Sequence, residues 1–354
     1  MLLSTQLLRP LYSTSLIVPW FRLLGAEVGS RCEIASAVYS APDLIEMGDE
    51  CFVADTVYLG LPAVHMGTIR LAHIRLGNRV FVGNGACLPM QTVLGSNTLV
   101  GVMSAPPLAH ALDDSNAVTR WPEPALRAEP GTAWLGSPAM FLPARQRPAR
   151  HFSDEMLYRP SLLRSAARYC FELVKITLPL TTYTFFVLLQ LGMFELLRSK
   201  LWPHFSTQES SLEAALQSGS WQFWLVWPFL YMAAGMLCAF IALLAKWLLV
   251  GKYIAGEHPL FSTLVWRHDI VTAMLESLVH PYFITMLRGT PFISFWFRLL
   301  GAEVGARVFL DTTHITEPDL VHIGNDVAVH ADAQIQTHLF EDRVLKVIRN
   351  RQQQ

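Results

Sequence analysis

A six-residue periodicity limits the fold of this 354-residue sequence more than any other feature. An aliphatic residue recurs at every sixth position over five hexads, and a small or β-branched residue follows each one four places later. A period of six matches neither the α-helix nor the flat strand, so it describes a coil that turns a corner every six residues. The aliphatic positions are Leu76, Val82, Leu88, Leu94 and Val100, and the small positions are Val80, Ala86, Thr92, Thr98 and Ser104.

Each aliphatic side chain then points inward and stacks on its counterpart one coil away, at about the 4.8 Å spacing of neighbouring strands. Glycine follows four of the five aliphatic positions, and we expect it to adopt turn dihedrals that other residues resist. A sandwich of short strands is the alternative fold, but it would not keep phase over five hexads. The pattern therefore predicts a stack of coils around an aliphatic column.

The chain also repeats itself on a larger scale. The segment 20–31, WFRLLGAEVGSR, returns at 296–307 with eleven of twelve residues identical. At the same offset of 276, the tripeptide at 42–44, Pro-Asp-Leu, returns at 318–320. The hexad phase reappears with it, at Val304, Ile323 and Val329. The sequence therefore predicts two tandem copies of the coiled domain.

Two long apolar runs separate the copies. Ile176 to Phe194 holds 19 residues without a charge, and Trp221 to Ala245 holds 25. At 1.5 Å per helical residue, runs of this length reach about 28 Å and about 37 Å, enough to cross the hydrocarbon core of a bilayer. Two buried core helices are the alternative. We expect two transmembrane helices.

The flanking charges predict an orientation for these helices. Residues 141–170 carry six arginines, whereas the connector 195–220 carries only Arg198 and Lys200. Positive residues concentrate on the cytoplasmic side, so the first flank is expected there. Two spans return the chain to its starting side. We therefore expect a multi-pass protein of the cell inner membrane with both coiled domains in the cytoplasm.

Composition excludes several classes of protein. Hydrophobic residues make up 52% of the chain and charged residues only 16%, which argues against a disordered protein. The net charge is −1, so no global field attracts nucleic acid, and no nucleic-acid partner is expected. The five cysteines form an odd set without a C-x-x-C pair, which argues against a disulfide framework and a zinc ribbon.

The hexads resemble those of the hexapeptide-repeat acyltransferases, whose fold is a left-handed parallel β-helix with three hexads per coil. A closer resemblance covers nearly the whole chain. The duplicated motif, FVGN at 81–84, LVGVMSAPP at 99–107, WLGSP at 134–138 and QTHLFEDR at 336–343 are similar to the C-terminal membrane region of nonribosomal peptide synthetases of the ε-poly-L-lysine synthetase type. In that family, tandem acetyltransferase-like domains alternate with membrane helices.

This resemblance implies an acyltransferase that forms amide bonds between amino acids delivered as thioesters. The implied acyl donor is a phosphopantetheine-linked carrier or a coenzyme A thioester, with no bound cofactor and no metal. The implied partners are adenylation and carrier-protein domains, an amino-acid substrate and the lipid bilayer, and a homo-oligomer is left open. The second copy lacks the five-hexad run, so one interpretation is that the chain is a truncated, inactive fragment of such a synthetase. The other alternative is a non-catalytic membrane scaffold or product-passing module.

The expected layout has six parts. A lead-in at 1–19 precedes a first β-helix domain at 20–145, transmembrane helices at 170–197 and 221–250, an interfacial helical linker at 251–295, and a second, incomplete β-helix domain at 296–354.

Acyl transfer to an amine needs a base, and histidine suits that task because its pKa lies near 6.5. In hexapeptide acyltransferases the histidine lies on a loop that leaves the β-helix just before a hexad run. His65 occupies that place in the first copy, and His338 is its counterpart once a three-residue length difference is allowed. A structural loop histidine is the alternative for each. We expect His65 to be the working base, because the first hexad stack is complete, and His338 to lie near an open, unpaired edge.

Five further residues are candidates for substrate binding. Glu341, Asp342 and Arg343 are expected to orient His338 or to hold a charged amino acid, unless they form a solvated turn. Asn84 is a candidate donor to the thioester oxygen, and a corner residue that satisfies backbone groups is the alternative. Trp134 closes the first domain. A zinc site of His65, His73 and His110 is a rival, but the spacing does not follow that of γ-class carbonic anhydrases.

Overall fold

The computed structural model describes residues 11–35, 37–38, 41–107, 127–144, 150–201, 221–331, 333–341, 343–348 and 350–352. The chain forms two compact units. Unit 1 comprises Met1–Glu172, Glu257–Ser262 and Leu339–Lys346, and unit 2 comprises Leu173–Gly256, Thr263–His338 and Val347–Gln354. Two short segments of the C-terminal half thus belong to unit 1, a grouping that the sequence layout does not contain. The six predicted domain boundaries stay predictions.

Unit 1 is a three-faced stack of short parallel strands. The first face holds β1 (Glu27–Val28), β4 (Ile45–Met47), β9 (Ile74–Leu76), β12 (Val93–Leu94) and β14 (Arg127–Ala128), in that order. The second holds β2 (Glu33–Ile34), β5 (Phe52–Val53), β10 (Phe81–Val82), β13 (Leu99–Val100) and β15 (Ala133–Leu135), followed by the antiparallel β16 (Met140–Phe141). The third holds β3 (Ala37–Val38), β6 (Val57–Leu61) and β11 (Cys87–Pro89). A parallel β-helix is therefore present, and its left-handedness stays a prediction.

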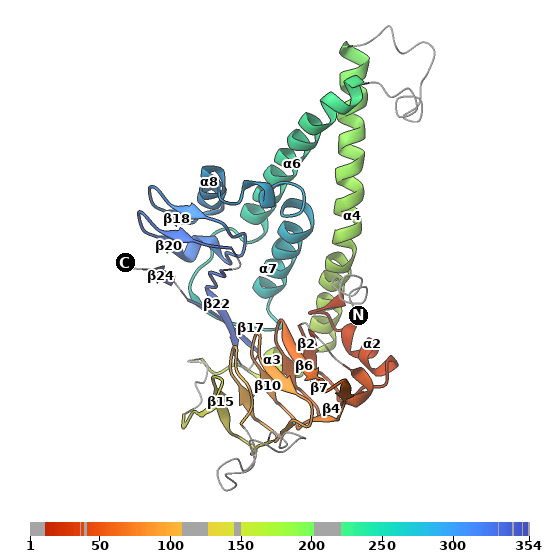
Figure 1. Cartoon of the computed structure of the whole chain (residues 1–354), viewed down its shortest axis with the longest axis vertical. Coiled ribbons are helices and arrows are strands. Elements are labelled where there is room, and N and C mark those ends of the chain that lie inside the picture. The colour runs from red at the N-terminus through yellow and green to blue at the C-terminus, as the bar shows by residue number, and fades with distance from the viewer. Residues whose placement is uncertain are drawn as a thin grey trace. The chain divides into compact units, whose positions relative to one another are not determined.

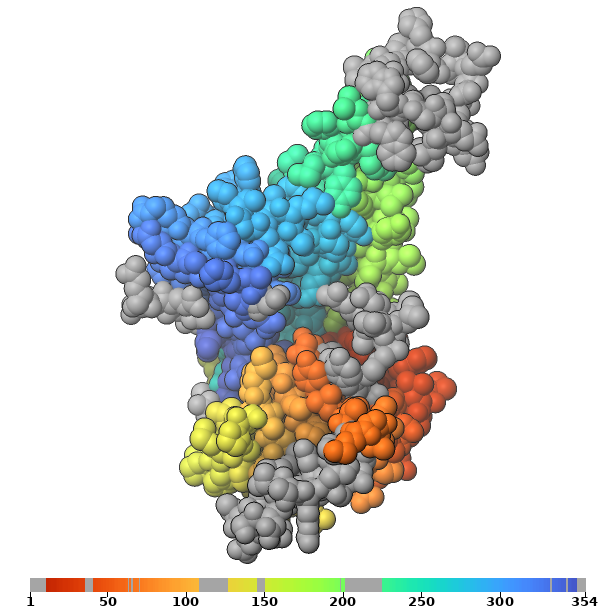
Figure 2. Space-filling model, in the orientation of Figure 1, coloured from red at the N-terminus to blue at the C-terminus, as the bar shows by residue number. Residues whose placement is uncertain are grey.

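The strand register shows which coils consist of three hexads and which coil is longer. Leu76 pairs with Leu94, 18 residues later, which is one coil of three hexads. Met47 pairs with Leu76, 29 residues later, because this coil carries an inserted hairpin of β7 (Ala63–His65) and β8 (Thr68–Arg70). Successive coils lie side by side from the red through the orange to the yellow part of the chain (Figure 2). His65 therefore lies on this hairpin, a segment that leaves the stack of coils and returns to it; such a segment is called an excursion below.

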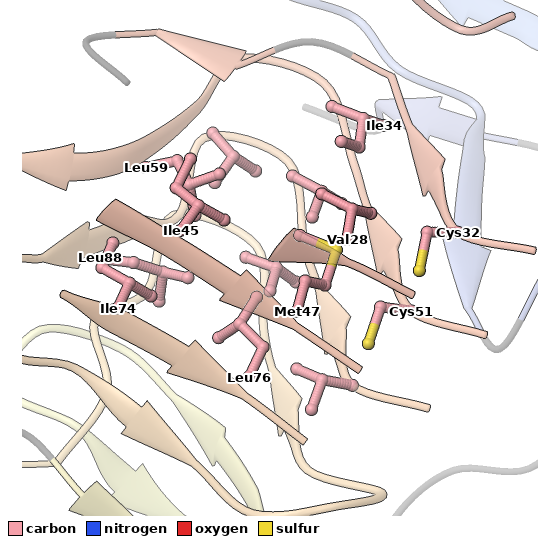
Figure 3. Close-up of a cluster of buried hydrophobic side chains, with 14 of the residues drawn as sticks. Val28, Cys32, Ile34, Ile45, Met47, Cys51, Leu59, Ile74, Leu76 and Leu88 are labelled. Atoms are coloured by element: carbon pink, nitrogen blue, oxygen red, sulfur yellow. The ribbon is translucent and has the colours of Figure 1, made fainter. Parts of the chain in front are cut away.

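The hexad prediction of an inward aliphatic column is confirmed. The five aliphatic residues of the hexads are at most 4% exposed, and the five small residues are at most 1% exposed. Figure 3 shows Ile45 beside Ile74 and Met47 beside Leu76, each pair on adjacent strands. Burial of such aliphatic side chains stabilises the stack of coils by about 1.5–3 kcal/mol each.

Glycine has a different role from the one expected. No positive φ occurs at Gly77, and the left-handed residue of that corner is Arg79, with φ 55°. A Cβ atom at Gly77 would instead lie 2.6 Å from the backbone nitrogen of Ser96 in the next coil. Glycine at this hexad position therefore allows adjacent coils to approach closely, and the turn is made two residues later.

The duplicated motif builds the same local structure twice. It forms α2 (Ile17–Leu23) in unit 1 and α8 (Pro291–Leu300) in unit 2, and each helix leads into a first strand. In unit 1, Arg22 donates from Nε to the carbonyl oxygen of Val28 at 2.8 Å. In unit 2, Arg298 donates in the same way to Val304 at 3.0 Å. The repeated sequence therefore specifies a helix that is fastened to the first coil.

Unit 1 also encloses a network of charges. Arg168, 8% exposed, donates two hydrogen bonds of 2.6 Å to the carboxylate of Glu33 and one of 2.6 Å to Glu172. Glu172 in turn accepts a hydrogen bond of 3.1 Å from the backbone of Ser15. Bidentate pairing satisfies groups that would be costly to bury alone. The network ties the start of the long helix α4 (Leu162–Leu201) to the first coil and to the N-terminal segment.

Two helices are long and apolar enough to cross a membrane, judged by length and composition. They are α4, with 40 residues, and α6 (Trp221–Leu249), with 29 (Figure 1). The short helix α7 (Thr263–Met274) and the turns η5 (Leu275–Val279) and η6 (Ile284–Leu287) follow α6 within unit 2. The apolar residues between 270 and 300 therefore form several short helices rather than a third long one.

Unit 2 contains the second set of coils. One face holds β18 (Glu303–Val304), β20 (Val321–Ile323) and β24 (Asn350–Gln352), all parallel, and a second face holds β19 (Phe309–Leu310) and β21 (Ala328–Val329). A bridge between Ile315 and Ile335 marks the third. Strand β24 pairs with β20, and β24 and β21 are the last described strands of their faces. The open edge expected near His338 stays a prediction. The coil between β20 and β24 spans the 29 residues from Ile323 to Gln352, the same interval as the coil that carries His65.

Candidate active site

His338 lies where this second long coil leaves the stack. It begins strand β22 (His338–Glu341), which lies next to β23 (Val344–Val347) in a three-stranded sheet with β17 (Gly256–Pro259). The excursion therefore occupies the same step of the winding as the β7–β8 hairpin of the first copy. The backbone of Thr337 accepts a hydrogen bond of 2.8 Å from Ile348, so the two ends of the excursion are joined.

Glu317 is the residue that holds the side chain of His338. Its Oε1 lies 2.7 Å from Nδ1 of His338, and its Oε2 accepts a hydrogen bond from the hydroxyl of Thr337. Glu317 is 3% exposed and has a left-handed backbone, with φ 37°, immediately before the turn η7 (Pro318–Leu320). Such a φ is uncommon outside glycine, and in this protein it recurs at corners of the coils, such as Arg79.

A second histidine completes the cluster. His268, on α7, points Nε2 at Oε1 of Glu317 from 3.4 Å, and its Nδ1 lies 2.8 Å from the hydroxyl of Tyr253. The rings of His268 and His338 meet edge to face, with centroids 5.6 Å apart. Tyr253, His268, Glu317 and His338 all belong to unit 2. They form one continuous polar chain from a helix, a turn and a strand.

The electrostatics of the cluster determine the protonation states of Glu317, His268 and Tyr253. Burial disfavours the charged form of Glu317, but the hydrogen bond from His338 and the nearby His268 outweigh burial and lower its pKa to about 2. Burial lowers the pKa of His268, although Glu317 opposes the shift, and burial also raises the pKa of Tyr253. At neutral pH the site therefore holds an ionised carboxylate, a neutral His268 and a protonated phenol.

This arrangement sets the tautomer of the neutral His338 ring. An ionised carboxylate only accepts hydrogen bonds, so Nδ1 of His338 carries the ring hydrogen. The side-chain nitrogen of Gln336 lies 3.5 Å from Nε2 of His338. The side chain of His338 is 14% exposed, whereas that of Glu317 is 1% exposed. A carboxylate that orients a histidine in this way is the arrangement of a general base.

The first copy differs at the position of Glu317. His65 lies on β7, where its backbone pairs with Thr68, and its side chain lies outside the described residues. At the offset of 276 that relates the two copies, Ala41 stands where the second copy has Glu317. The first copy therefore has no carboxylate at this place. Glu317 could have been found by comparing the two copies at the residue that precedes their shared Pro-Asp-Leu.

The residues proposed beside His338 have other contacts. Among the described residues, Glu341 pairs with Lys346, and the buried Arg343 donates to the backbone oxygens of Arg31, Cys51 and Leu157. Asp342 lies outside the described residues. Glu341 and Arg343 both belong to unit 1, whereas the His338 cluster belongs to unit 2. Their assignment as substrate-binding residues stays a prediction, and the orienting contact to His338 comes from Glu317.

Asn84 and Trp134 also belong to unit 1. The side-chain oxygen of Asn84 accepts a hydrogen bond of 3.3 Å from the backbone of Asp55, which matches the corner role that sequence analysis gave as the alternative. Trp134 donates from Nε1 to the hydroxyl of Thr132 at 2.9 Å and packs edge to face on Phe141. Both contacts are made within the β-helix. Their binding roles stay predictions.

Of the alternative zinc site in the first copy, the structure describes only the side chain of His73. Its Nδ1 lies 3.0 Å from Oε1 of Glu46. His110 lies outside the described residues, as does the side chain of His65.

Comparison with known proteins tests the resemblance to a peptide synthetase. No family model matches the chain. The chain is 34% identical over 346 residues to the delta-poly-L-ornithine synthetase of Acinetobacter baumannii (strain AB307-0294). The match covers 97% of this chain and 23% of that protein, so the chain spans about a quarter of the relative's length. This relative is named for ornithine, not for the lysine type expected from the motifs.

Two solved structures are similar in part. One is the hexapeptide-repeat containing acetyltransferase VCA0836 from Vibrio cholerae, at 13% identity and a TM-score of 0.27, which covers 37% of this chain and 80% of that one. The other is a maltose O-acetyltransferase from Clostridium difficile 630, at 17% identity and a TM-score of 0.25, covering 37% and 75%. The chain is thus similar over nearly its whole length to one part of a poly-amino-acid synthetase.

Proposed function

We propose that this chain is a membrane-anchored, acyltransferase-like part of a peptide synthetase, and that it forms amide bonds between amino acids delivered as thioesters. The observation that carries the proposal is the His338–Glu317 pair, a partly exposed base held by a buried carboxylate. The similarity to the poly-ornithine synthetase supports the same activity. Adenylation and carrier domains are the proposed partners, and a carrier-bound or coenzyme A thioester is the proposed acyl donor.

The residues of the site account for each proton in this reaction. The amine nitrogen of one amino acid attacks the thioester carbonyl carbon of another, so that a C–N bond forms. Nε2 of His338 removes the proton that the nitrogen must lose. The C–S bond then breaks, and the proton passes from His338 to the departing thiolate. Glu317 keeps the imidazole in the required tautomer and stabilises its positive charge between the two transfers.

A direct assay distinguishes the enzyme from a non-catalytic scaffold. Membranes that contain the chain, supplied with adenylation and carrier domains, are given an aminoacyl carrier thioester and a free amino acid. We expect an amide product by mass spectrometry from the unchanged chain and much less from the Glu317→Gln variant. A scaffold that passes on a product predicts no amide from either protein. It also predicts equal binding of a preformed peptide by both.

The proposal places α4 and α6 across the membrane, with the two sets of coils on the cytoplasmic side. The six arginines between residues 141 and 170 support this orientation. A cysteine introduced at Ser211, in the connector, is expected to react with an impermeant maleimide added to intact cells. A cysteine at the exposed Ser137 is expected to react only after the cells are opened. Labelling of both in intact cells would contradict the two-span topology.

A further inference from the structure

Three metal-binding groups meet in unit 2. One ligand atom from each of His268, Glu317 and His338 lies within 4.8 Å of the other two. The two histidines come from α7 and β22, and the carboxylate comes from the turn before η7, so distant parts of the sequence converge. Surface acidic clusters bind cations loosely, but here two residues are buried and the third is largely so. Convergence of imidazole and carboxylate groups at a buried point is typical of a transition-metal site.

The groups around these three residues are those that orient metal ligands. Tyr253 contacts Nδ1 of His268, which aims the other ring nitrogen at Glu317. The hydroxyl of Thr337 binds Oε2 of Glu317, which leaves Oε1 toward the two histidines. Metal-bound histidines and carboxylates characteristically have such outer partners, because these contacts fix the ligand's direction and tautomer.

Two of the three ligand separations are close to those of a zinc site, and the ligand atoms of the two histidines, within 4.8 Å of each other, would have to come closer. Ligands about 2.0–2.1 Å from a tetrahedral zinc ion lie about 3.3 Å from one another. The 3.4 Å between Nε2 of His268 and Oε1 of Glu317 already meets this separation. The 2.7 Å between Glu317 and Nδ1 of His338 is a hydrogen bond, and it would have to open as the ion enters.

We propose that His268, Glu317 and His338 bind one divalent transition-metal ion of the zinc type, with a fourth position left for water. Two imidazole ligands disfavour Mg²⁺ and Ca²⁺, which prefer oxygen. The ion takes Nδ1 of His338, so the ring hydrogen moves to Nε2. His268 takes the tautomer in which Nδ1–H donates to Tyr253. A bound metal ion therefore leaves no lone pair on Nε2 and prevents His338 from acting as the base. This loss of activity rests on the proposed function, whereas metal binding does not depend on it.

Metal binding is measured on the full chain in detergent, first freed of metal with a chelator and then titrated with Zn²⁺ by calorimetry. We expect one ion per chain. Co²⁺ in its place should give the visible absorption of a four-coordinate site. His268→Ala should abolish stoichiometric binding, and Tyr253→Phe, which leaves all three ligands, should weaken it ~10-fold.

The matched control is His322→Ala. His322 also has Nδ1 at 3.0 Å from a carboxylate, that of Glu303, but the pair is exposed and is not part of the three-ligand cluster. This variant should bind Zn²⁺ as the unchanged chain does. Failure of the unchanged chain to bind one equivalent, or equal binding by the His268 variant, would overturn the metal site. Amide formation by a chain that does not bind Zn²⁺ would reject this site alone. A chain that binds one Zn²⁺ but makes no amide in its metal-free form would reject the proposed function alone.

Discussion

Replacing His338 with alanine is expected to lower the rate of amide formation by ~10²-fold or more, the usual scale for loss of a general base. The loss should fall mainly on kcat, because the base acts on the proton released in the transition state. Glu317→Gln should also lower kcat ~10²-fold, since a neutral amide neither fixes the tautomer nor stabilises the imidazolium. Initial rates measured against amine concentration test both expectations.

His65→Ala is the matched comparison for this experiment. The two histidines lie on excursions from equivalent coils, but the first copy has Ala41 in place of the glutamate. We therefore expect the His65 variant to retain most of its activity. A larger loss in the His65 variant would restore the expectation drawn from the complete hexad stack. Unchanged rates in both variants would dismiss both histidines as the base.

Replacing Arg168 with methionine is expected to destabilise unit 1 by about 3–5 kcal/mol, the usual cost of leaving buried charges unpaired. Glu33 and Glu172 would lose their hydrogen bonds to the guanidinium while remaining buried. The denaturation midpoint of the full chain in detergent should fall accordingly. Adding Glu33→Gln and Glu172→Gln to the same chain should restore much of the midpoint, because the uncompensated charges are then removed.

Arg307→Met is the control for this effect. Arg307 also pairs with a carboxylate, Asp326, but its side chain is 73% exposed. Exposed ion pairs contribute little to stability, so this variant should melt almost as the unchanged chain does. Equal destabilisation by the two substitutions would show that burial of the Arg168 network is not what makes it important.

The local pattern of the sequence was enough for the β-helix. Inward positions such as Leu76, Val82 and Leu88 were identified from period alone, since a coil that turns every six residues has no other way to bury them. The role of glycine was not identified in this way, because periodicity does not distinguish a residue that makes a turn from one that lets a neighbouring coil approach. Gly77 lets the next coil approach, and Arg79 makes the turn.

His338 was singled out from the sequence, but the residues that contact its side chain were not. Tyr253, His268 and Glu317 come from a loop, a helix and a turn spread over 65 residues, and no spacing rule links them. The pairing of β24 with β20 is a similar case, because the segment 350–352 shows no hexad. Repetition and apolar runs are local properties, so the sequence by itself determined the coils, the duplication and the two long helices. Convergence of distant polar groups depends on how those coils and helices pack, and only the tertiary structure showed that Glu317 and His268 meet at His338.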